Sequence, residues 1–342
     1  STYLHAITIL TGNASAVSSR DKVLLIVPQF HVMAWGYPYM CVMAGADMVL
    51  PSLHLQPDAL INLLQTENIT YANGVPTIWM GVYDALKKNP PKEKLKLREF
   101  TVGGSAIAIS LIEGFEKDFG IKAVQAWGMT ETSPLGTVAK LQPGHDDLPY
   151  EEQLKIRGKQ GFELPGVEIR AVDDNGKVLP RDGVSVGEIE IRGAWIINSY
   201  YKLKDNSERF SKDGWFKTGD VATLDKYGFM NITDRTKDLI KSGGEWISSV
   251  ALETAIFAHP KVKEAAVIAI PDEKWMERPL ACVVVKENET LTIEELRQFL
   301  GKEFASYQLP DKIAIINEVP KTSVGKFDKK VLRQMYAEGK LN

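Results

Sequence analysis

Short apolar runs alternate with helix-periodic segments between Lys22 and Ala126, and this alternation limits the folds open to the chain. The runs, such as the one at residues 22–27, are rich in Val, Ile and Leu and have the length of a buried strand. The segments between them repeat apolar residues at the spacing of one helix face. Strands that alternate with helices favour an α/β layer with a mostly parallel sheet. We therefore expect such a layer at the start of the fold.

The expected elements of this layer place three polar or glycine-bearing loops at strand ends. Strands are expected at residues 22–27, 46–50, 69–72, 99–102 and 122–126, and helices at 58–67, 76–88 and 110–119. Pro76 suits a first helical turn, where its missing N–H costs nothing. The loops are at 28–31, 103–106 and 127–132. Because ligands bind at the carboxyl ends of parallel strands, we expect these loops to form a site.

Two further units follow the α/β layer. Short alternating segments at 167–172, 187–192 and 229–233 predict a small antiparallel β unit. Residues 234–342 then predict a compact α+β domain, with helices at 249–259 and 328–338 and strands at 265–270, 280–286 and 312–316. A capping box at Thr292 predicts a further helix that begins there and runs towards Ala305. The expected division is 1–150, 151–233 and 234–342, the first two parts forming one large domain.

Composition excludes several classes of function. Of 342 residues, 44% are hydrophobic and 25% charged, and the net charge of −3 gives no basic excess for nucleic acid. The apolar runs are too short to cross a bilayer. Cys41 and Cys282 match neither a metal nor a redox motif. We expect a cytoplasmic protein, with loose association to membranes and a homodimer left open. Since the chain starts at Ser1 inside an apolar-periodic segment, we also expect an N-terminal truncation.

The stretch 215–247 concentrates Asp, Arg, Lys and Gly between the two differently built parts of the chain. Thr218-Gly219-Asp220 is expected at a turn that ends a tight segment. A carboxylate such as that of Asp220 can accept two hydrogen bonds from a sugar diol. Arg235 can anchor the same sugar or its phosphate. The alternative is a solvated, charged turn.

Five separated blocks together resemble the adenylate-forming superfamily, which includes acyl-CoA synthetases, firefly luciferase and peptide-synthetase adenylation domains. They are WGMTE at 127–131, GEIEIRG at 187–193, WFKTGD at 215–220, DRTKDLIKSGG at 234–244 and PKTSVGK at 320–326. Each block is weak alone, but their order and spacing cover nearly the whole chain. Residues 27–35 and 243–248 also resemble the medium- and long-chain fatty acyl-CoA synthetases.

The resemblance implies a partial adenylation domain followed by a small, mobile C-terminal domain, and a reaction in two steps. A fatty acid carboxylate would attack ATP to give acyl-AMP and pyrophosphate, and coenzyme A would then take the acyl group and release AMP. The family's Ser/Thr/Gly-rich phosphate loop is absent from the sequence, and Ser1 is expected to lie just beyond it. Such a loop wraps triphosphate oxygens with backbone N–H groups.

The resemblance also implies a role for each residue that matches a family motif. Glu131 would hold Mg²⁺, Thr130 would contact the α-phosphate, and Lys326 would reach the reacting carboxylate. Lys237 would be a hinge, Lys241, Gly243 and Gly244 would act in the coenzyme A step, and His31 would position the reactants. Trp35 and Trp246 would line an acyl tunnel. The residues expected to bind the nucleotide are Gly103, Gly104, Ser105, Gln125, Ala126, Trp127, Gly128, Met129, Asp220 and Arg235.

Simpler interpretations of these residues remain open at the sequence level. Trp127, Trp35, Trp246 and His31 would also fit an ordinary core, and Thr130-Glu131 would also fit helix capping. The cations of the hinge and of the last loop also fit a solvated surface. Two rival functions follow: a short-chain, aryl or amino-acid adenylating relative, or a module that binds nucleotide or coenzyme A without turnover.

Overall fold

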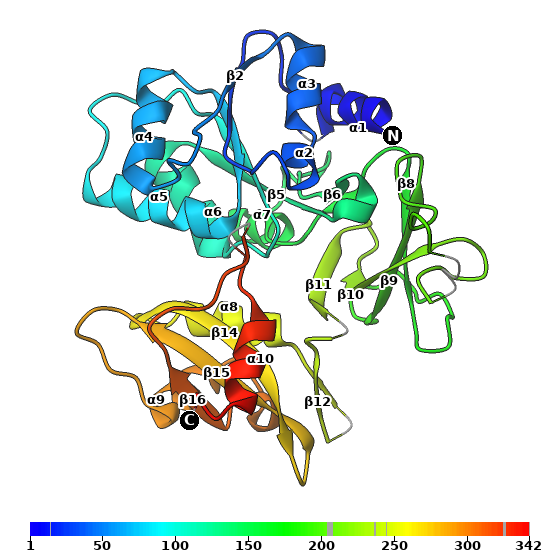
Figure 1. Cartoon of the computed structure of the whole chain (residues 1–342), viewed down its shortest axis with the longest axis vertical. Coiled ribbons are helices and arrows are strands. Elements are labelled where there is room, and N and C mark those ends of the chain that lie inside the picture. The colour runs from blue at the N-terminus through cyan, green and yellow to red at the C-terminus, as the bar shows by residue number, and fades with distance from the viewer. Residues whose placement is uncertain (14, 204–207, 236, 244, 324–325, 342) are drawn as a thin grey trace. The chain divides into compact units, whose positions relative to one another are not determined.

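The computed structural model describes the chain except for residues 14, 204–207, 236, 244, 324, 325 and 342 (Figure 1). It divides into two compact units. The first comprises residues 1–218 and 222–232, and the second comprises 219–221 and 233–342. Apart from residues 219–221, the second unit runs without a break from residue 233. The three-part division of the sequence analysis remains a prediction.

A seven-stranded sheet organises the first unit, with the order β2-β1-β3-β4-β5-β6-β7. Its strands are β1 Lys22–Leu25, β2 Asp47–Val49, β3 Tyr71–Gly74, β4 Glu99–Gly103, β5 Lys122–Gly128, β6 Leu135–Val138 and β7 Phe162–Glu163. The five strands from β2 to β5 are parallel, and β6 and β7 continue the sheet antiparallel. The expectation of a mostly parallel sheet is confirmed.

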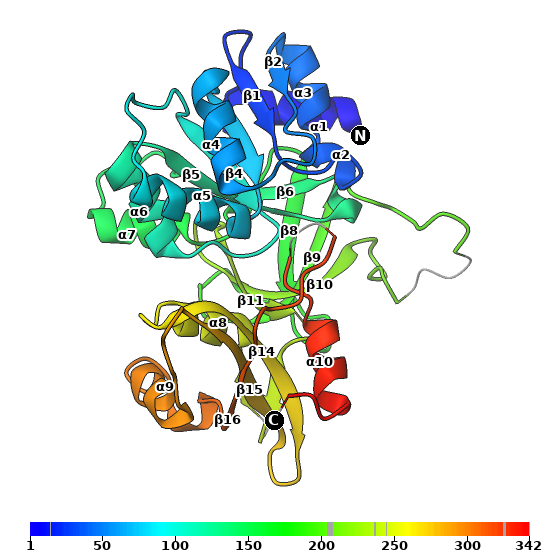
Figure 2. The same cartoon turned by 60° about the vertical axis from the view of Figure 1, so that its left-hand side comes forward.

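Helices cover both faces of this sheet because successive strand residues point to opposite sides. Val23 and Leu25 of β1 join one buried cluster, whereas Leu24 and Ile26 join another. The stacked α4, α5 and α6 cover the second cluster, and α1 and α3 lie on the other side (Figure 2). The helical elements of this unit are α1 Thr2–Thr8, a π-helix Ile9–Asn13, α2 Val32–Trp35, α3 Tyr37–Ala44, α4 Pro57–Thr66, α5 Pro76–Lys88, α6 Ile109–Phe119 and α7 Tyr150–Arg157.

The sequence predicted the strands β1 to β5 and the helices α4 to α6 to within about two residues at most of their ends. Pro76 occupies the first turn of α5, as expected. The strands β6 and β7 and the helices α3 and α7 were not predicted, because short segments carry little periodic signal. In the described part of the chain no helix is both long and apolar enough to span a bilayer.

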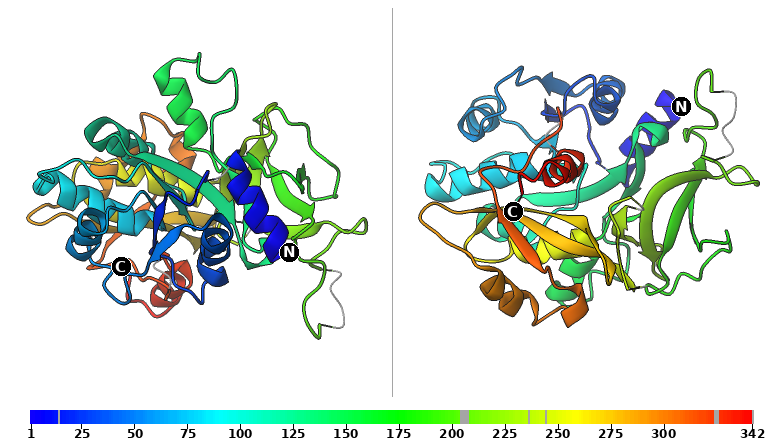
Figure 3. Two further views of the ribbon diagram at one scale, coloured as in Figure 1. Left: turned by 90° about the horizontal axis from the view of Figure 1, so that it is seen from above. Right: turned by 60° about the horizontal axis from the view of Figure 1, so that its bottom comes forward.

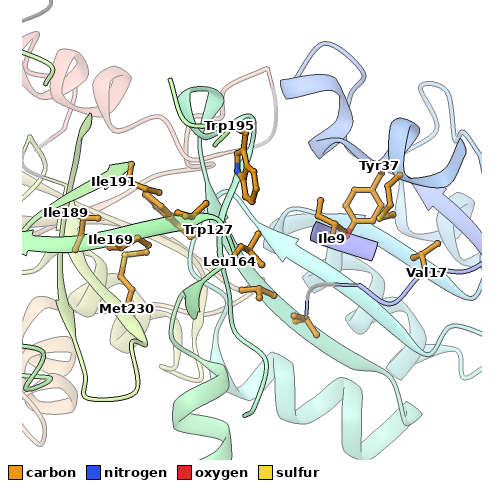
Figure 4. Packing of buried hydrophobic residues seen from close by; sticks show 14 of the residues in the cluster. Ile9, Val17, Tyr37, Trp127, Leu164, Ile169, Ile189, Ile191, Trp195 and Met230 are labelled. Atoms are coloured by element: carbon orange, nitrogen blue, oxygen red, sulfur yellow. The ribbon is translucent and has the colours of Figure 1, made fainter. Parts of the chain in front are cut away.

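A second sheet, in the order β11-β10-β9-β8, confirms the small antiparallel β unit. Its strands are β8 Val167–Val172, β9 Gly187–Gly193, β10 Phe216–Leu224 and β11 Met230–Arg235. Ile169, Ile189 and Met230 of this sheet share one buried cluster with Trp127 and Ile9 of the first sheet's layer (Figure 4). This shared core joins the two sheets.

The expectation of a turn at Thr218-Gly219-Asp220 is wrong. These residues lie in the middle of β10, which continues to Leu224. Gly219 has a φ of +74°, a conformation that side chains rarely adopt, and this allows a local irregularity inside a strand. The sequence analysis interpreted Gly219 as the end of a segment, whereas it marks a kink inside the strand β10.

The second unit contains a five-stranded sheet with helices on both faces. β13, β12, β15 and β14 are neighbours in that order, and β16 pairs with β15. Helices α8 and α9 cover one face and α10 the other, as Figure 3 shows on its right side for the red α10. The elements are β12 Ile240–Ser242, β13 Glu245–Ile247, α8 Ser249–Phe257, β14 Val262–Asp272, β15 Met276–Val285, α9 Ile293–Leu300, β16 Lys312–Ile315 and α10 Lys329–Ala337. The α+β domain is confirmed.

One helix of this unit is shorter than expected. The Thr292 side chain caps α9 by accepting a 3.2 Å hydrogen bond from the Glu295 N–H, as the capping box predicts. However, α9 ends at Leu300 and does not reach Ala305. Gly301 follows at the C-cap with a right-handed conformation (φ −63°), so this helix does not end in a left-handed glycine cap.

The turn α2 has an unusual backbone. Val32, Met33, Ala34 and Trp35 all have positive φ angles, from 42° to 57°. The left-handed conformation costs roughly 1–2 kcal/mol for each residue that carries a Cβ. No glycine relieves the strain within the turn, and Gly36 follows it directly. The segment between His31 and Gly36 therefore stores conformational energy next to the end of β1.

We expect Met33→Gly to raise the free energy of unfolding by up to about 1 kcal/mol, because glycine adopts a positive φ without strain. Met33 is 50% exposed, so little packing is lost. The matched control is Met43→Gly, at a similarly exposed position of α3, which should lower the stability by about 0.5–1 kcal/mol. Denaturant titration measures both. Equal destabilisation by the two variants would contradict the strained turn.

Candidate functional site

Three loops leave the carboxyl ends of β1, β4 and β5, as the parallel arrangement predicts. β4 and β5 are neighbours, and Gly103 pairs with Ala126 across them. The loop after β4 therefore starts beside the segment that leads to Gly128. This edge of the sheet brings together the largest group of residues that the sequence analysis assigned to nucleotide binding.

Close backbone contact explains the glycines after β4. A Cβ at Gly103 would lie 2.8 Å from the Ala126 carbonyl oxygen and 3.4 Å from the Trp35 ring. Gly104 has a φ of +87°, which also favours glycine. Ser105 follows and is exposed. The loop therefore presents backbone and a hydroxyl rather than bulky side chains, which suits close approach of a flat ligand.

The side chain of Gln125 supports the loop that follows β4. Its side chain is 1% exposed, and its Oε1 accepts a 2.9 Å hydrogen bond from the Ile107 N–H. Its Nε2 is buried and makes no hydrogen bond within the described part of the structure. Gln125 thus acts at least as a support of the loop at 103–107, while its contact with a nucleotide remains a prediction.

Trp127 lies largely in the core. It is 8% exposed, and a Cβ at Gly136 would lie 2.6 Å from its ring, so the indole packs directly on that backbone. Figure 4 shows it beside Ile191, at the junction of the two sheets. Ala126 is equally buried. The position of Trp127 at the end of β5 agrees both with a core residue and with a residue that stacks on adenine, so adenine stacking stays a prediction.

After β5 the chain returns onto itself in a tight turn. A Cβ at Gly128 would lie 1.8 Å from the Pro134 carbonyl oxygen, so only glycine fits there. The Met129 N–H donates to this same oxygen over 3.0 Å, and to the Thr132 Oγ1 over 2.9 Å. Thr132 is buried, whereas Thr130 is exposed. The turn thus directs Thr130 towards the surface.

Glu131 is fixed by a residue that the sequence analysis missed. The Tyr200 hydroxyl donates a 2.8 Å hydrogen bond to Glu131 Oε1. Burial and then this hydrogen bond raise the pKa of Tyr200 to about 12. Tyr200 is 69 positions away from Glu131 and outside every recognised block, so no sequence signal indicated the pair.

The carboxylate of Glu131 is compatible with a Mg²⁺ ion that takes most of its ligands from phosphate and water. Among the described residues there is no cluster of three His, Cys, Asp or Glu side chains that could hold a metal. Mg²⁺ is commonly bound by one or two carboxylates together with substrate phosphates and water. The half-buried carboxylate of Glu131 beside the exposed Thr130 fits that type of site and no all-protein cage.

The loop after β1 carries the other two residues assigned to this unit. His31 is half-buried and directly precedes the left-handed turn. Trp35 ends that turn, and its ring lies next to Gly103. The structure thus brings Trp35 to the glycine loop, whereas its role in an acyl tunnel remains a prediction.

Asp220 and Arg235 form an ion pair in the second unit. Arg235 Nε lies 3.3 Å from Asp220 Oδ1. The Asp220 side chain is 9% exposed, whereas that of Arg235 is 54% exposed. The two residues that the sequence assigned to one ribose are therefore adjacent, with the guanidinium reaching solvent.

Lys326 belongs to a closed loop of the same unit. The Lys326 N–H donates to Thr322 Oγ1 over 3.2 Å, and the Thr322 N–H donates to the Lys326 carbonyl oxygen over 2.8 Å. Burial lowers the pKa of the Lys326 ammonium, Arg235 lowers it further, and Asp220 opposes the shift. The lysine is therefore held where its positive charge is unfavourable in the absence of an added anion.

The residues assigned to the hinge and the coenzyme A step lie at the start of the second unit. Lys237 is exposed. Lys241 pairs with Trp246 across β12 and β13, and its Nζ lies 4.8 Å from the centre of that ring. Trp246 is 45% exposed. Gly243 has a φ of +62° and donates to the Trp275 carbonyl oxygen over 2.8 Å, and Gly244 lies outside the described residues.

The comparisons with known proteins match both parts of the chain. The profile of the AMP-binding enzyme family matches residues 2–201, and that of the AMP-binding enzyme C-terminal domain matches residues 251–326. The first match alone covers more than half of the chain.

Two curated relatives align over almost the whole chain. A 3-methylmercaptopropionyl-CoA ligase of Ruegeria lacuscaerulensis is 46% identical over 99% of the chain. A long-chain-fatty-acid–CoA ligase of Thermus thermophilus is 45% identical over 97% of it. The chain spans only 62% and 61% of their lengths, so about two fifths of each relative has no counterpart in the matched region.

A solved structure agrees with the fold. The ATP-bound MatB from Rhodopseudomonas palustris superposes with a TM-score of 0.85 at 26% identity, covering 99% of this chain and 64% of that one. The α/β architecture expected from the sequence is thereby confirmed.

We expect Lys326→Gln to raise the melting temperature of the ligand-free chain at pH 7. The pKa of Lys326 is lowered by folding, so its charge destabilises the folded state below that pKa. Between the lowered pKa and the usual lysine value the wild type regains this stability as the lysine loses its proton. The gain of the variant should therefore shrink as the pH rises towards the usual lysine pKa. Thermal unfolding at pH 7, 9 and 10 measures it.

Lys330→Gln is the matched control, because Lys330 is exposed four residues later. It should leave the melting temperature unchanged at all three pH values. A lower melting temperature for Lys326→Gln at pH 7 would contradict the unfavourable position of the charge.

Proposed function

The chain belongs to the AMP-binding enzyme family, and from this premise we propose that it acts in the ATP-dependent ligation of a carboxylic acid to coenzyme A. In the first step the carboxylate oxygen attacks the α-phosphorus of ATP, which forms acyl-AMP and expels pyrophosphate. In the second step the sulfur of coenzyme A attacks the acyl carbon, AMP leaves, and the thiol proton is lost. Because the chain spans about three fifths of its relatives, the activity of the whole protein is part of the proposal.

The pairing of β4 with β5, which places the loops after both strands side by side, is the observation that carries the proposal. Gly103 and Ala126 are paired, so Gly104 and Ser105 start beside the turn at Gly128 and Met129. In the proposal, backbone at this edge takes the flat adenine, supported by Gln125 and Trp127. The carboxylate of Asp220 accepts hydrogen bonds from the ribose hydroxyls, and Arg235 supports the same sugar.

The phosphate chemistry is assigned to three side chains. Thr130 is exposed and would donate its hydroxyl to the α-phosphate. Glu131 would hold Mg²⁺, which, when bound, neutralises phosphate charge. Lys326 would stabilise the charge that develops where carboxylate and phosphate meet. The lowered pKa of Lys326 supports this role, because an anionic ligand would relieve the unfavourable charge.

The second step is assigned to the start of the second unit. Lys237 would serve as the hinge, since a few residues between elements can absorb a backbone change. Lys241, Gly243 and Gly244 would then act on coenzyme A. His31 would position the carboxylate and the thiol. These assignments rest on the motif positions, and the strained turn after His31 supports a functional role for that loop.

The acid is proposed to be a medium- or long-chain fatty acid. The similarity to the Thermus long-chain enzyme supports it, and Trp35 and Trp246 would line an apolar tunnel. Each buried CH₂ group contributes about 0.8 kcal/mol, which suffices to select chain length. The similar identity to the Ruegeria enzyme favours a second candidate, a short thioether acid such as 3-methylmercaptopropionate. We also propose a cytoplasmic location, with loose membrane association and homodimerisation as further properties to test.

We expect the chain to convert synthetic acyl-AMP and coenzyme A to acyl-CoA and AMP in equal amounts. This half-reaction needs no contact with the β- and γ-phosphates, so it is independent of a phosphate loop. Asp220→Ala should raise the KM for acyl-AMP by roughly 10-fold or more, because hydrogen bonds to a charged group contribute about 1.5–3 kcal/mol. Acyl-CoA is measured by chromatography.

Asp174→Ala, in an exposed turn, is the matched control and should behave as the wild type. A panel of C8 to C16 acids and 3-methylmercaptopropionate, each as its acyl-AMP, ranks the substrates, with aryl and aminoacyl adenylates as further rivals. Binding of acyl-AMP without acyl-CoA formation would favour a nucleotide-binding module. Absence of both would contradict the proposal. Pyrophosphate release from Mg-ATP and acid measures the first half-reaction separately.

A further inference from the structure

A tyrosine outside the family's recognised blocks contacts the side chain proposed to hold the metal. The Tyr200 hydroxyl donates to Glu131 Oε1 over 2.8 Å. A carboxylate has two oxygens and about four acceptor positions, so one hydrogen bond at Oε1 leaves acceptor capacity for a cation. The bond also restricts the rotation of a side chain that would otherwise sample several rotamers.

The contact is one of several hydrogen bonds between the segment that follows β9 and the turn that follows β5. The Ile197 N–H donates to the Glu131 carbonyl oxygen over 2.8 Å, and the Trp195 Nε1–H donates to the Leu135 carbonyl oxygen over 3.0 Å. The segment after β9 is therefore hydrogen-bonded to both ends of the turn that carries Glu131. The centre of the Tyr200 ring lies 6.4 Å from that of Phe216, edge to face. The Tyr200 ring also packs against the buried cluster that joins the first and second sheets.

We propose that Tyr200 is a positioning residue for the metal step: it holds the Glu131 carboxylate so that its second oxygen faces the cation of the bound nucleotide. The inference rests on the proposed function, in which Glu131 is the protein's ligand to Mg²⁺. Side chains that hydrogen-bond to metal ligands fix their orientation, and their loss typically costs 10–100-fold in metal affinity or activity. Mg²⁺ commonly takes only one or two protein carboxylates, so a misplaced Glu131 would remove a large part of the protein's own contribution to the site.

The test measures metal binding and needs no turnover. Mn²⁺ replaces Mg²⁺ as a paramagnetic probe, and electron paramagnetic resonance gives its dissociation constant in the presence of the chain and ATP. Tyr200→Phe removes only the hydroxyl and keeps the ring beside Phe216. We expect it to weaken Mn²⁺ binding about 10-fold while the affinity for AMP, measured by calorimetry without metal, stays within about twofold.

The neighbouring tyrosine offers a matched control. Tyr201 is 90% exposed, so Tyr201→Phe should leave both affinities unchanged. Glu131→Gln should weaken Mn²⁺ binding at least as much as Tyr200→Phe. The double variant should lose no more than Glu131→Gln alone, because the two residues act through one interaction.

The outcomes separate this inference from the proposed function. Unchanged Mn²⁺ affinity in Tyr200→Phe, or an equal loss of Mn²⁺ and AMP affinity, would overturn the positioning role. AMP binding by the wild type without Mn²⁺ binding in the presence of ATP would overturn it as well and leave the adenylate site intact. A wild type that binds neither AMP nor Mn²⁺ with ATP would contradict the proposed function itself, and the inference with it.

Discussion

The return of the chain at Gly128 is the constraint on which the candidate site depends. A side chain there would overlap the Pro134 carbonyl oxygen, at 1.8 Å from a Cβ, so backbone packs on backbone. The hydrogen bonds of Met129 to Pro134 and Thr132 close the turn. Thr130 is then exposed and Glu131 meets Tyr200. A wider turn would no longer hold Thr130 and Glu131 at the edge of the sheet where β4 and β5 end.

The sequence was informative where the signal is local and periodic. Pro76 marked the first turn of α5, and β-branched runs marked the parallel strands, because these cues act within a few residues. Gly219 misled because glycine both ends segments and allows kinks within strands, and only pairing with a neighbouring strand distinguishes the two. The end of α9 at Leu300 was not predicted, because the residue that follows it, Gly301, has a right-handed conformation and gives no clear stop signal.

The parts of the site that the sequence did not indicate depend on contacts far along the chain or on unusual backbone. Tyr200 reaches Glu131 across 69 positions, and no local pattern encodes that distance. The positive φ angles from Val32 to Trp35 occur without the Gly, Asn or Asp that usually signals them. The Trp127 ring packs on the backbone of Gly136, a residue of the next strand, and the motif around Trp127 did not indicate that contact. Such features need the fold before they can be seen.

The central claim is that an adenylate binds at the carboxyl ends of β4 and β5. Photolabelling the chain with 8-azido-AMP and mapping the modified peptides by mass spectrometry tests it most directly. The account predicts label within residues 103–107 or 125–130, and its loss when excess AMP competes. Label elsewhere in the chain, or label at these segments that AMP does not displace, would contradict the claim.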